Sequence, residues 1–263
     1  MQKRISFKNS QGQRLVGILH IPADRQPGGQ SSSGSGRLPV VMVQHGFSGN
    51  FNDLLIKQIA LRLERTGFAV LRFAFSGHRP SGGGYKKVLV SQFIRDLVAA
   101  INFLARQKQV DINKLGLVGH SMGGFTALMA ANVLGKRLKA IVSISSYFDL
   151  DSLIAYYQKN HPVKVRDQYW QIGKFKISKR HFADRRYLKK RYLISMIKRP
   201  VLVIHGENDR TVKLRDASAI YQLLHQPKAL RIIKKGDHNF NGNKQNQKLI
   251  ANACQRWFRK YLL

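Results

Sequence analysis

The sequence predicts a doubly wound α/β architecture, in which a mostly parallel sheet lies between two layers of helices. From residue 39 onward, short apolar runs rich in β-branched residues alternate with amphipathic stretches of helical periodicity. The length of 263 residues suffices for one large core. A basic and aromatic segment interrupts this alternation once, at residues 146–198. These observations favour a single α/β domain that carries one insertion.

The N-terminal part predicts an antiparallel hairpin. Polar and apolar residues alternate at 3–8 and again at 14–22, and residues 9–12 form the connection. The segment at about 25–37 is rich in Gly and Ser, which is typical of a flexible surface loop rather than of a linker between domains. We therefore expect one domain over residues 1–263.

Parallel strands and helices follow in turn. Six apolar runs predict buried strands at 40–43, 69–73, 115–118, 140–144, 201–204 and 230–233. Helical patterns between and after them predict helices at 53–66, 88–108, 122–134, 213–225 and 245–260. Such βαβ alternation predicts a parallel sheet with helices on both faces.

The insertion at about 146–198 has no run that predicts a strand, but it holds many aromatic and basic residues. An insertion of this length predicts a helical cap over the carboxyl edge of the sheet, where open α/β sheets bind ligands. Residues 159–199 hold 14 Lys or Arg against two Asp. We therefore expect an apolar pocket beneath a cationic rim, unless these charges only solvate the cap helices.

The overall charge is strongly basic, because 46 Lys and Arg stand against 13 acidic residues, a formal net charge of +33. Such a surface attracts polyanions and anionic membranes without specificity. The basic residues are spread along the chain and no nucleic-acid-binding motif is present, so we expect no specific binding of nucleic acid.

Cysteine content and hydropathy exclude several further classes of protein. Cys254 is the only cysteine, which excludes an intrachain disulfide and a multi-cysteine metal site, and we expect neither a metal nor a cofactor. The first residues lack the apolar core of a signal peptide, and no apolar run approaches the ~18 residues of a membrane span. The cytoplasm is the expected location.

The motif G-x-S-x-G occurs at residues 119–123, directly after an apolar run and before a helical pattern. This context predicts a nucleophile elbow, a strained turn that raises the serine hydroxyl above the sheet. Gly119 and Gly123 keep side chains out of the crowded turn. We therefore predict Ser121 as a nucleophile.

A serine nucleophile needs a base within hydrogen-bond reach and an acid that orients the base. Two later strands end in short polar loops that deliver Asp209 and His238 to the carboxyl edge, so we predict Asp209 as the acid and His238 as the base. In the competing interpretation Asp209 caps a helix and His238 has no chemical role. Asp237 is interpreted as a turn residue. Three other carboxylates stay open as the acid: Asp149, Asp151 and Glu207.

A carbonyl oxygen under nucleophilic attack becomes negative and needs two backbone N–H donors. We predict that Phe47 and Met122 supply them, Phe47 from the loop after an early strand and Met122 from the residue after the nucleophile. Two histidines, His45 and His120, flank the site, and we expect them to orient loops through hydrogen bonds.

Four motifs together resemble the α/β-hydrolase superfamily: His-Gly-Phe at 45–47, Gly-His-Ser-Met-Gly-Gly at 119–124, His-Gly-Glu-Asn-Asp at 205–209 and Gly-Asp-His-Asn-Phe at 236–240. That fold places nucleophile, acid and base in this order along the chain. Residues 71–78 are similar to the cinnamoyl and feruloyl esterase-like branch. However, Ala74 stands where that branch has aspartate, and residues 79–81 read Arg-Pro-Ser where it has Gly-x-Ser. A phenolic ester is therefore not implied.

The resemblance implies a serine hydrolase that cleaves carboxylic esters of small molecules through an acyl-enzyme intermediate. We expect the basic insertion to favour anionic esters by steering them, an effect that salt screens over ~8 Å at physiological ionic strength. An acyltransferase or a peptidase with the same residues stays open. A non-catalytic, polyanion-binding protein of this fold also stays open.

Overall fold

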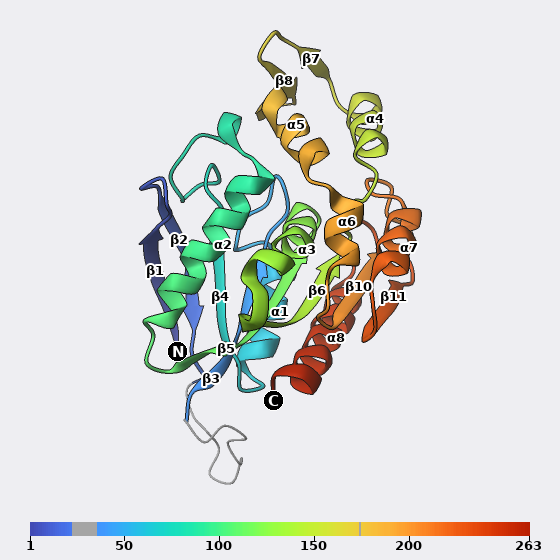
Figure 1. Ribbon diagram of the computed structural model, residues 1–263. Helices are drawn as coiled ribbons and strands as arrows, with labels where there is room; N and C mark the ends of the chain where they lie inside the picture. Colours follow the sequence, from blue (N-terminus) through green and yellow to red (C-terminus); the bar gives the residue numbers. More distant parts are fainter. Residues whose placement is uncertain (23–35, 174) are drawn as a thin grey trace.

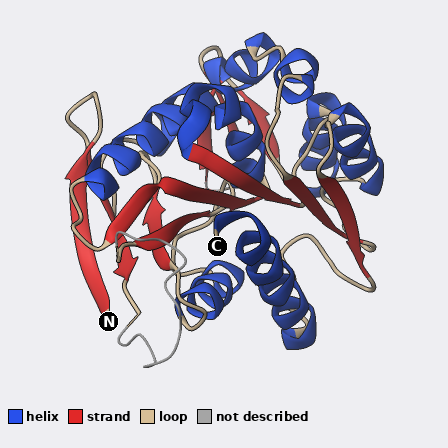
Figure 2. Ribbon diagram, turned by 60° about the horizontal axis from the view of Figure 1, so that its bottom comes forward, coloured by secondary structure: helices blue, strands red, loops and turns tan. Residues whose placement is uncertain are grey.

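The computed structural model describes residues 1–22, 36–173 and 175–263. Within these ranges, an eight-stranded sheet lies between two layers of helices (Figures 1 and 2). The Gly/Ser loop expected at about 25–37 lies outside the described residues except for its last two. The doubly wound α/β architecture is confirmed, whereas the single-domain division of the chain stays a prediction.

The strands of the large sheet are, in order across it, β1 (Gln2–Lys8), β2 (Arg14–His20), β4 (Ala69–Ala74), β3 (Leu38–Gln44), β5 (Val110–His120), β6 (Leu138–Ile144), β10 (Val201–Gly206) and β11 (Lys228–Ile233). β1 pairs with β2 and β2 pairs with β4 in antiparallel fashion, and all other pairs are parallel. The predicted hairpin and the six predicted parallel strands are therefore confirmed.

Five helices cover the two faces of this sheet: α1 (Leu54–Glu64), α2 (Val90–Ala105), α3 (Met122–Leu134), α7 (Leu214–Leu223) and α8 (Lys244–Leu262). Each begins and ends within three residues of the predicted helix. Single turns of 3₁₀-helix lie at η1 (Tyr85–Lys87) and η2 (Gly135–Arg137).

Alternation along β3 shows how the sheet separates two cores. Val41 and Val43 pack with α1 and α8 on one face, whereas Val40 and Met42 pack with α2 and α3 on the other. All four side chains are fully buried. Successive strand residues point to opposite faces, and a strand covered on both faces therefore reads as a continuous apolar run. Figure 2 shows the helices on both sides of the strands.

The insertion connects β6 to β10 and projects at the top of Figure 1. It consists of α4 (Leu150–Asn160), β7 (Val163–Val165), β8 (Tyr169–Ile172), β9 (Phe175–Ser178), α5 (Lys179–Tyr187) and α6 (Lys190–Ser195). The insertion contains helices as expected, but the expectation that it holds no strand was wrong, because β7, β8 and β9 form a small antiparallel sheet. Strands of three or four residues are too short to show a period of two, and their pairing depends on neighbouring strands.

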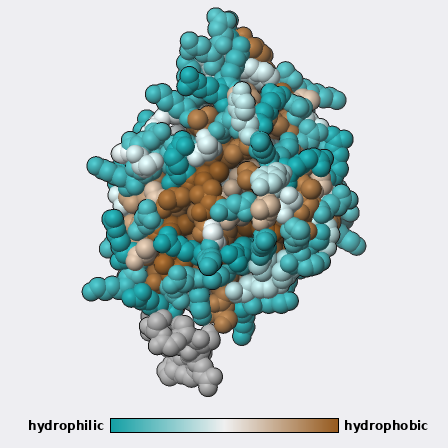
Figure 3. Space-filling view, viewed as in Figure 1, coloured by the Kyte–Doolittle hydropathy of each residue, from teal (hydrophilic) through white to brown (hydrophobic). Residues whose placement is uncertain are grey.

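The face shown in Figure 3 is hydrophilic around its edge and more hydrophobic near its middle. Among the helices that the structure describes, none combines the length and apolar character required to cross a membrane.

Candidate active site

Ser121 occupies a strained turn between β5 and α3. Its φ is +52°, a left-handed conformation that non-glycine residues rarely adopt. A Cβ on Gly119 would lie 2.3 Å from the backbone of Gly123, and a Cβ on Gly123 would lie 2.5 Å from the His45 carbonyl oxygen. Only glycine fits at both positions, as the G-x-S-x-G motif predicts. The turn leaves the serine side chain at the carboxyl end of β5.

A chain of hydrogen bonds joins Ser121, His238 and Asp209, which come from three different loops. Ser121 Oγ lies 3.0 Å from His238 Nε2, and His238 Nδ1 lies 2.7 Å from Asp209 Oδ2. Because a carboxylate only accepts, Nδ1 carries the proton, and Nε2 is free to accept the serine hydroxyl proton. The arrangement can therefore activate Ser121 as a nucleophile.

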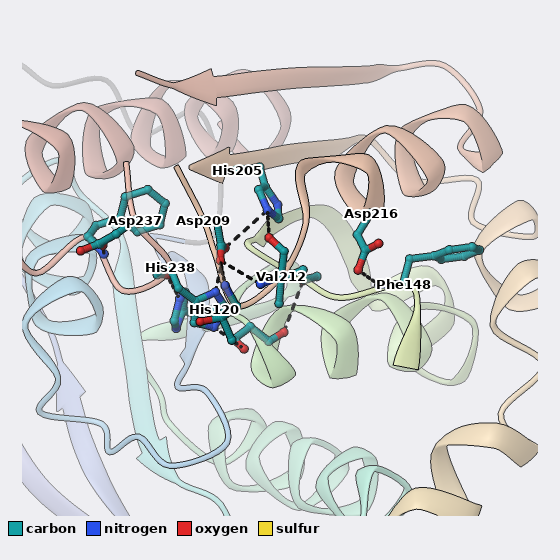
Figure 4. A network of polar contacts seen from close by, with 12 residues as sticks. His120, Phe148, His205, Asp209, Val212, Asp216, Asp237 and His238 are labelled. Atoms are coloured by element: carbon teal, nitrogen blue, oxygen red, sulfur yellow. Dashed lines mark hydrogen bonds and ion pairs between the residues drawn. The ribbon is translucent and has the colours of Figure 1, made fainter. Parts of the chain in front are cut away.

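Asp209 is held in place by its own loop. Its side chain is fully buried, and Oδ1 accepts hydrogen bonds from the backbone N–H groups of Thr211 and Val212 (Figure 4). Burial alone would raise the pKa of this carboxyl, but the hydrogen bonds from His238 and Val212 outweigh it and lower the pKa below its usual value. Asp209 does not cap α7, whose N-cap residue is Lys213. It is therefore an ionised acceptor that fixes the histidine.

The other carboxylates considered for this position are engaged elsewhere. Glu207 accepts a hydrogen bond from the Lys235 backbone, and Asp149 caps the N-terminus of α4. Asp151 forms an exposed ion pair with Arg186. Asp237 accepts from the Phe240 backbone, which fits the expected turn residue. Of the acids left open by the sequence, only Asp209 contacts His238.

The expected oxyanion donors lie on either side of Ser121. Met122 is the first residue of α3, so its backbone N–H has no acceptor within the helix. Phe47 lies in the loop after β3, and a Cβ on neighbouring Gly46 would stand 3.3 Å from Ser121 Cβ. Phe47, Ser121 and Met122 line one small cavity. The geometry is compatible with two amides that face one carbonyl oxygen.

Two residues that the sequence did not single out hold the Phe47 loop. The Phe47 carbonyl oxygen accepts hydrogen bonds from His78 Nε2 and from the Tyr85 hydroxyl, the latter at 2.8 Å. Burial lowers the pKa of His78 and raises that of Tyr85, so both donors are neutral. His78 could have been found from the sequence, because the Gly-His pair at residues 77–78 belongs to the stretch that is similar to the esterase branch. Tyr85 lies in none of the motifs.

His45 and His120 orient loops, as expected. His45 donates from Nδ1 to the Gly46 carbonyl at 2.7 Å and accepts at Nε2 from the Phe75 backbone. His120 donates from Nε2 to the His238 carbonyl oxygen at 2.7 Å. Burial lowers the pKa of each to about 3, so both stay neutral near pH 7. Their hydrogen bonds position the backbone on either side of Ser121.

Two hollows meet at Ser121. The outer one, which we call the cleft, has a volume of about 440 Å³, and its wall includes His238 and, from the insertion, Tyr156, Tyr157 and His161. The other, which we call the inner cavity, has a volume of only about 20 Å³. Besides Ser121, its wall includes Phe47, Met122, Tyr147, Tyr157, His181 and Arg185. The insertion therefore closes over the nucleophile and divides the space around it.

One family model matches most of the chain. The model of the prolyl oligopeptidase family matches residues 81–263, which include Ser121, Asp209 and His238 but not Phe47. Among curated proteins, the uncharacterized 31.7 kDa protein of the traX-finO intergenic region of Escherichia coli is 29% identical over 116 residues. That match covers 44% of this chain and 40% of the relative's own length.

Solved structures extend the likeness to the whole chain. The esterase domain of a Rhodothermus marinus protein matches with a TM-score of 0.76 at 23% identity and covers 100% of both chains. Est1E from Butyrivibrio proteoclasticus, solved with ferulic acid bound, matches with a TM-score of 0.81 at 17% identity and covers 98% of both chains. At these identities the likeness shows the fold alone, and the expected α/β-hydrolase fold is confirmed.

Proposed function

The chain belongs to the prolyl oligopeptidase family of the α/β-hydrolase superfamily, and on that premise we propose that it is a serine hydrolase of carboxylic esters. The observation that carries the proposal is the hydrogen-bonded chain from Ser121 Oγ through His238 to Asp209. In this proposal Ser121 is the nucleophile, His238 the base and Asp209 the acid that orients it.

Acylation begins when Ser121 Oγ attacks the ester carbonyl carbon and His238 Nε2 takes the hydroxyl proton. Asp209 keeps the proton on Nδ1 and stabilises the imidazolium that forms. The backbone amides of Phe47 and Met122 donate to the carbonyl oxygen as it becomes negative. The tetrahedral intermediate then expels the alcohol, which takes its proton from His238, and leaves the acyl group on Ser121.

Deacylation repeats these steps with water in place of serine. His238 accepts a proton from water, and the resulting hydroxide attacks the acyl carbonyl. The intermediate releases the carboxylic acid and returns the proton to Ser121 Oγ. No metal or redox cofactor enters either half of this proposal.

The size of the cleft favours a small-molecule ester as the partner. Sites for small ligands have volumes of roughly 300–1,000 Å³, and the cleft, at about 440 Å³, lies within that range. A peptidase with the same residues is the second candidate, and the match to the prolyl oligopeptidase family favours it. We keep non-specific contact with polyanions or anionic membranes as a separate proposal from the charge of +33.

Fluorophosphonate labelling of the full chain tests the proposal. We expect the label on Ser121, together with turnover of p-nitrophenyl butyrate that disappears in Ser121→Ala. Ser48→Ala is the matched control, because Ser48 is an exposed serine that lines the same cleft. If the folded protein neither accepts the label on Ser121 nor hydrolyses short p-nitrophenyl esters, the serine hydrolase proposal is wrong.

A matched ester and anilide separate the two candidates. N-acetyl-alanine p-nitrophenyl ester and N-acetyl-alanine p-nitroanilide carry the same acyl group and differ in the bond that is cleaved. We expect Ser121-dependent turnover of the ester and little of the anilide. Comparable kcat/KM values for both would favour the peptidase.

A further inference from the structure

Arg185 is a buried cation that the proposed mechanism does not use. It lies on α5 of the insertion, only 5% exposed, and it lines the inner cavity together with Ser121. An arginine on the surface keeps its guanidinium hydrated, whereas the guanidinium of Arg185 is removed from water. A charge removed from water is costly unless a partner compensates it.

The protein supplies little compensation for this charge. Within the described ranges, no carboxylate lies within 4.0 Å of Arg185. One terminal nitrogen donates to Met122 Sδ at 3.0 Å, and a thioether is a weak acceptor. The Nε–H is buried without a partner. Even the neighbouring Asp184 points elsewhere, because its carboxylate accepts from the Ser91 backbone.

Aromatic rings hold the guanidinium in place without neutralising it. Its central carbon lies 4.9 Å from the centre of the Tyr147 ring and 5.8 Å from that of Phe47. Such cation–π contacts offset part of the desolvation cost. They leave the planar set of N–H donors, which matches the two oxygens of a carboxylate. The guanidinium therefore lies against two aromatic rings, and no carboxylate of the described residues pairs with it.

The alcohol part and the acyl part of an ester would lie in different hollows, because both the cleft and the inner cavity include Ser121 in their walls. The leaving alcohol must lie near His238 Nε2, from which it takes its proton, and His238 lines the cleft but not the inner cavity. The acyl group is then directed toward the inner cavity, past the amides of Phe47 and Met122. Arg185 forms part of the wall of that cavity.

We propose that Arg185 binds a carboxylate at the far end of the acyl group, so that the preferred substrates are half-esters of short dicarboxylic acids. This inference rests on the proposed ester hydrolase. A cavity of about 20 Å³ holds a group of about the size of a water molecule. It therefore excludes a long aliphatic chain or an aromatic ring, and a short acyl chain that ends in a carboxylate enters only when the side chains of its wall move apart.

Matched pairs of ethyl esters test the proposal. Monoethyl succinate, glutarate and adipate are compared with ethyl butyrate, pentanoate and hexanoate, each pair having the same number of acyl carbons. We expect wild-type kcat/KM to favour the half-ester by about 10- to 100-fold for at least one of the shorter pairs, as a charge-assisted hydrogen bond would give. Equal values in all three pairs would overturn the proposal.

Two neighbouring arginines provide the variant and its control. Arg185→Met is expected to reduce the half-ester preference to near one. Arg186→Met removes the same charge from the next residue, whose side chain is 57% exposed and pairs with Asp151, and it is expected to keep the preference. If both variants lower the preference equally, or if 0.5 M salt abolishes it in wild type, distant steering by the basic surface explains the effect and the proposal is wrong.

The proposal stays testable if Arg185→Met does not fold. Arg185→Lys keeps the positive charge but loses the fork of donors, so the preference must still fall severalfold. An unchanged preference in Arg185→Lys would contradict bidentate binding. Hydrolysis of the neutral esters without any half-ester preference would refute this inference alone, whereas absence of both hydrolysis and Ser121 labelling would refute the proposed function.

Discussion

Replacement of Asp209 by asparagine keeps the shape of the side chain, yet we expect it to reduce turnover by about 10⁴-fold. The carboxylate accepts on both oxygens. Oδ1 accepts from the backbone N–H groups of Thr211 and Val212 at 2.9 and 2.8 Å, and Oδ2 accepts from His238 at 2.7 Å. An asparagine has only one oxygen for these two tasks.

The contacts decide which way the amide faces. If its oxygen faced His238, its NH₂ group would meet the two backbone N–H groups, and each unsatisfied donor would cost about 1–3 kcal/mol. The oxygen is therefore expected at the Oδ1 position, with the NH₂ group toward His238 Nδ1. The histidine must then accept at Nδ1 and carry its proton on Nε2. In that tautomer it cannot take the proton of Ser121.

Steady-state hydrolysis of p-nitrophenyl butyrate measures the effect on kcat. Glu207→Gln and Asp151→Asn are the controls, because each neutralises a carboxylate that the structure engages away from His238. Both are expected to keep kcat close to the wild-type value, because neither carboxylate contacts His238. Thermal unfolding of all four proteins checks that the fold is intact. If Asp209→Asn keeps even a tenth of wild-type kcat, the assigned role of Asp209 is wrong.

Three further predictions concern the same site. Ser121→Ala is expected to lose at least about 10⁴-fold in turnover of p-nitrophenyl butyrate without unfolding, and retention of a tenth of the activity would contradict the assignment. Tyr85→Phe removes one of the two donors to the Phe47 carbonyl oxygen, so kcat should fall roughly tenfold with little change in KM, and an unchanged kcat would show that this hydrogen bond does not position the loop. His120, with a pKa lowered to about 3 by burial against a usual 6.5, binds fewer protons in the folded state than in the unfolded state at intermediate pH. The free energy of unfolding should therefore fall by up to about 1.4 kcal/mol per pH unit for this group as the pH drops below 6.5. His120→Gln keeps an N–H donor for the His238 carbonyl and should remove that contribution, which urea unfolding at pH 6.5 and 4.5 would reveal as a smaller loss than in wild type.

Local patterns in the sequence predicted the parts of this protein that depend on neighbouring residues. Continuous apolar runs predicted the central strands because those strands are covered on both faces. The glycines around Ser121 predicted the strained turn, since no larger side chain fits between β5 and α3. Asp209 and His238 follow strands of one parallel sheet, and the carboxyl ends of such strands share an edge, so their approach to Ser121 was predictable.

The choice among the acids was not determined by the sequence. Asp149, Asp151, Glu207 and Asp209 all follow strands, and only side-chain direction separates them. Three of them turn to a helix N-terminus, a surface arginine or a backbone amide, whereas Asp209 turns to His238. A side-chain direction in a loop depends on the hydrogen bonds of that loop, and no periodicity encodes it.

The insertion shows most clearly what only the tertiary structure decided. Its basic composition predicted a cationic rim, but it could not distinguish Arg185, which is 5% exposed, from Arg186, whose side chain is 57% exposed. The short strands of the insertion likewise gained their identity from pairing with one another. Burial of Arg185 requires Phe47, Met122 and Tyr147 to converge from three distant segments. Residue type and spacing determine the long strands and helices, whereas the packing of separate elements determines the short strands of the insertion and which charge is removed from water.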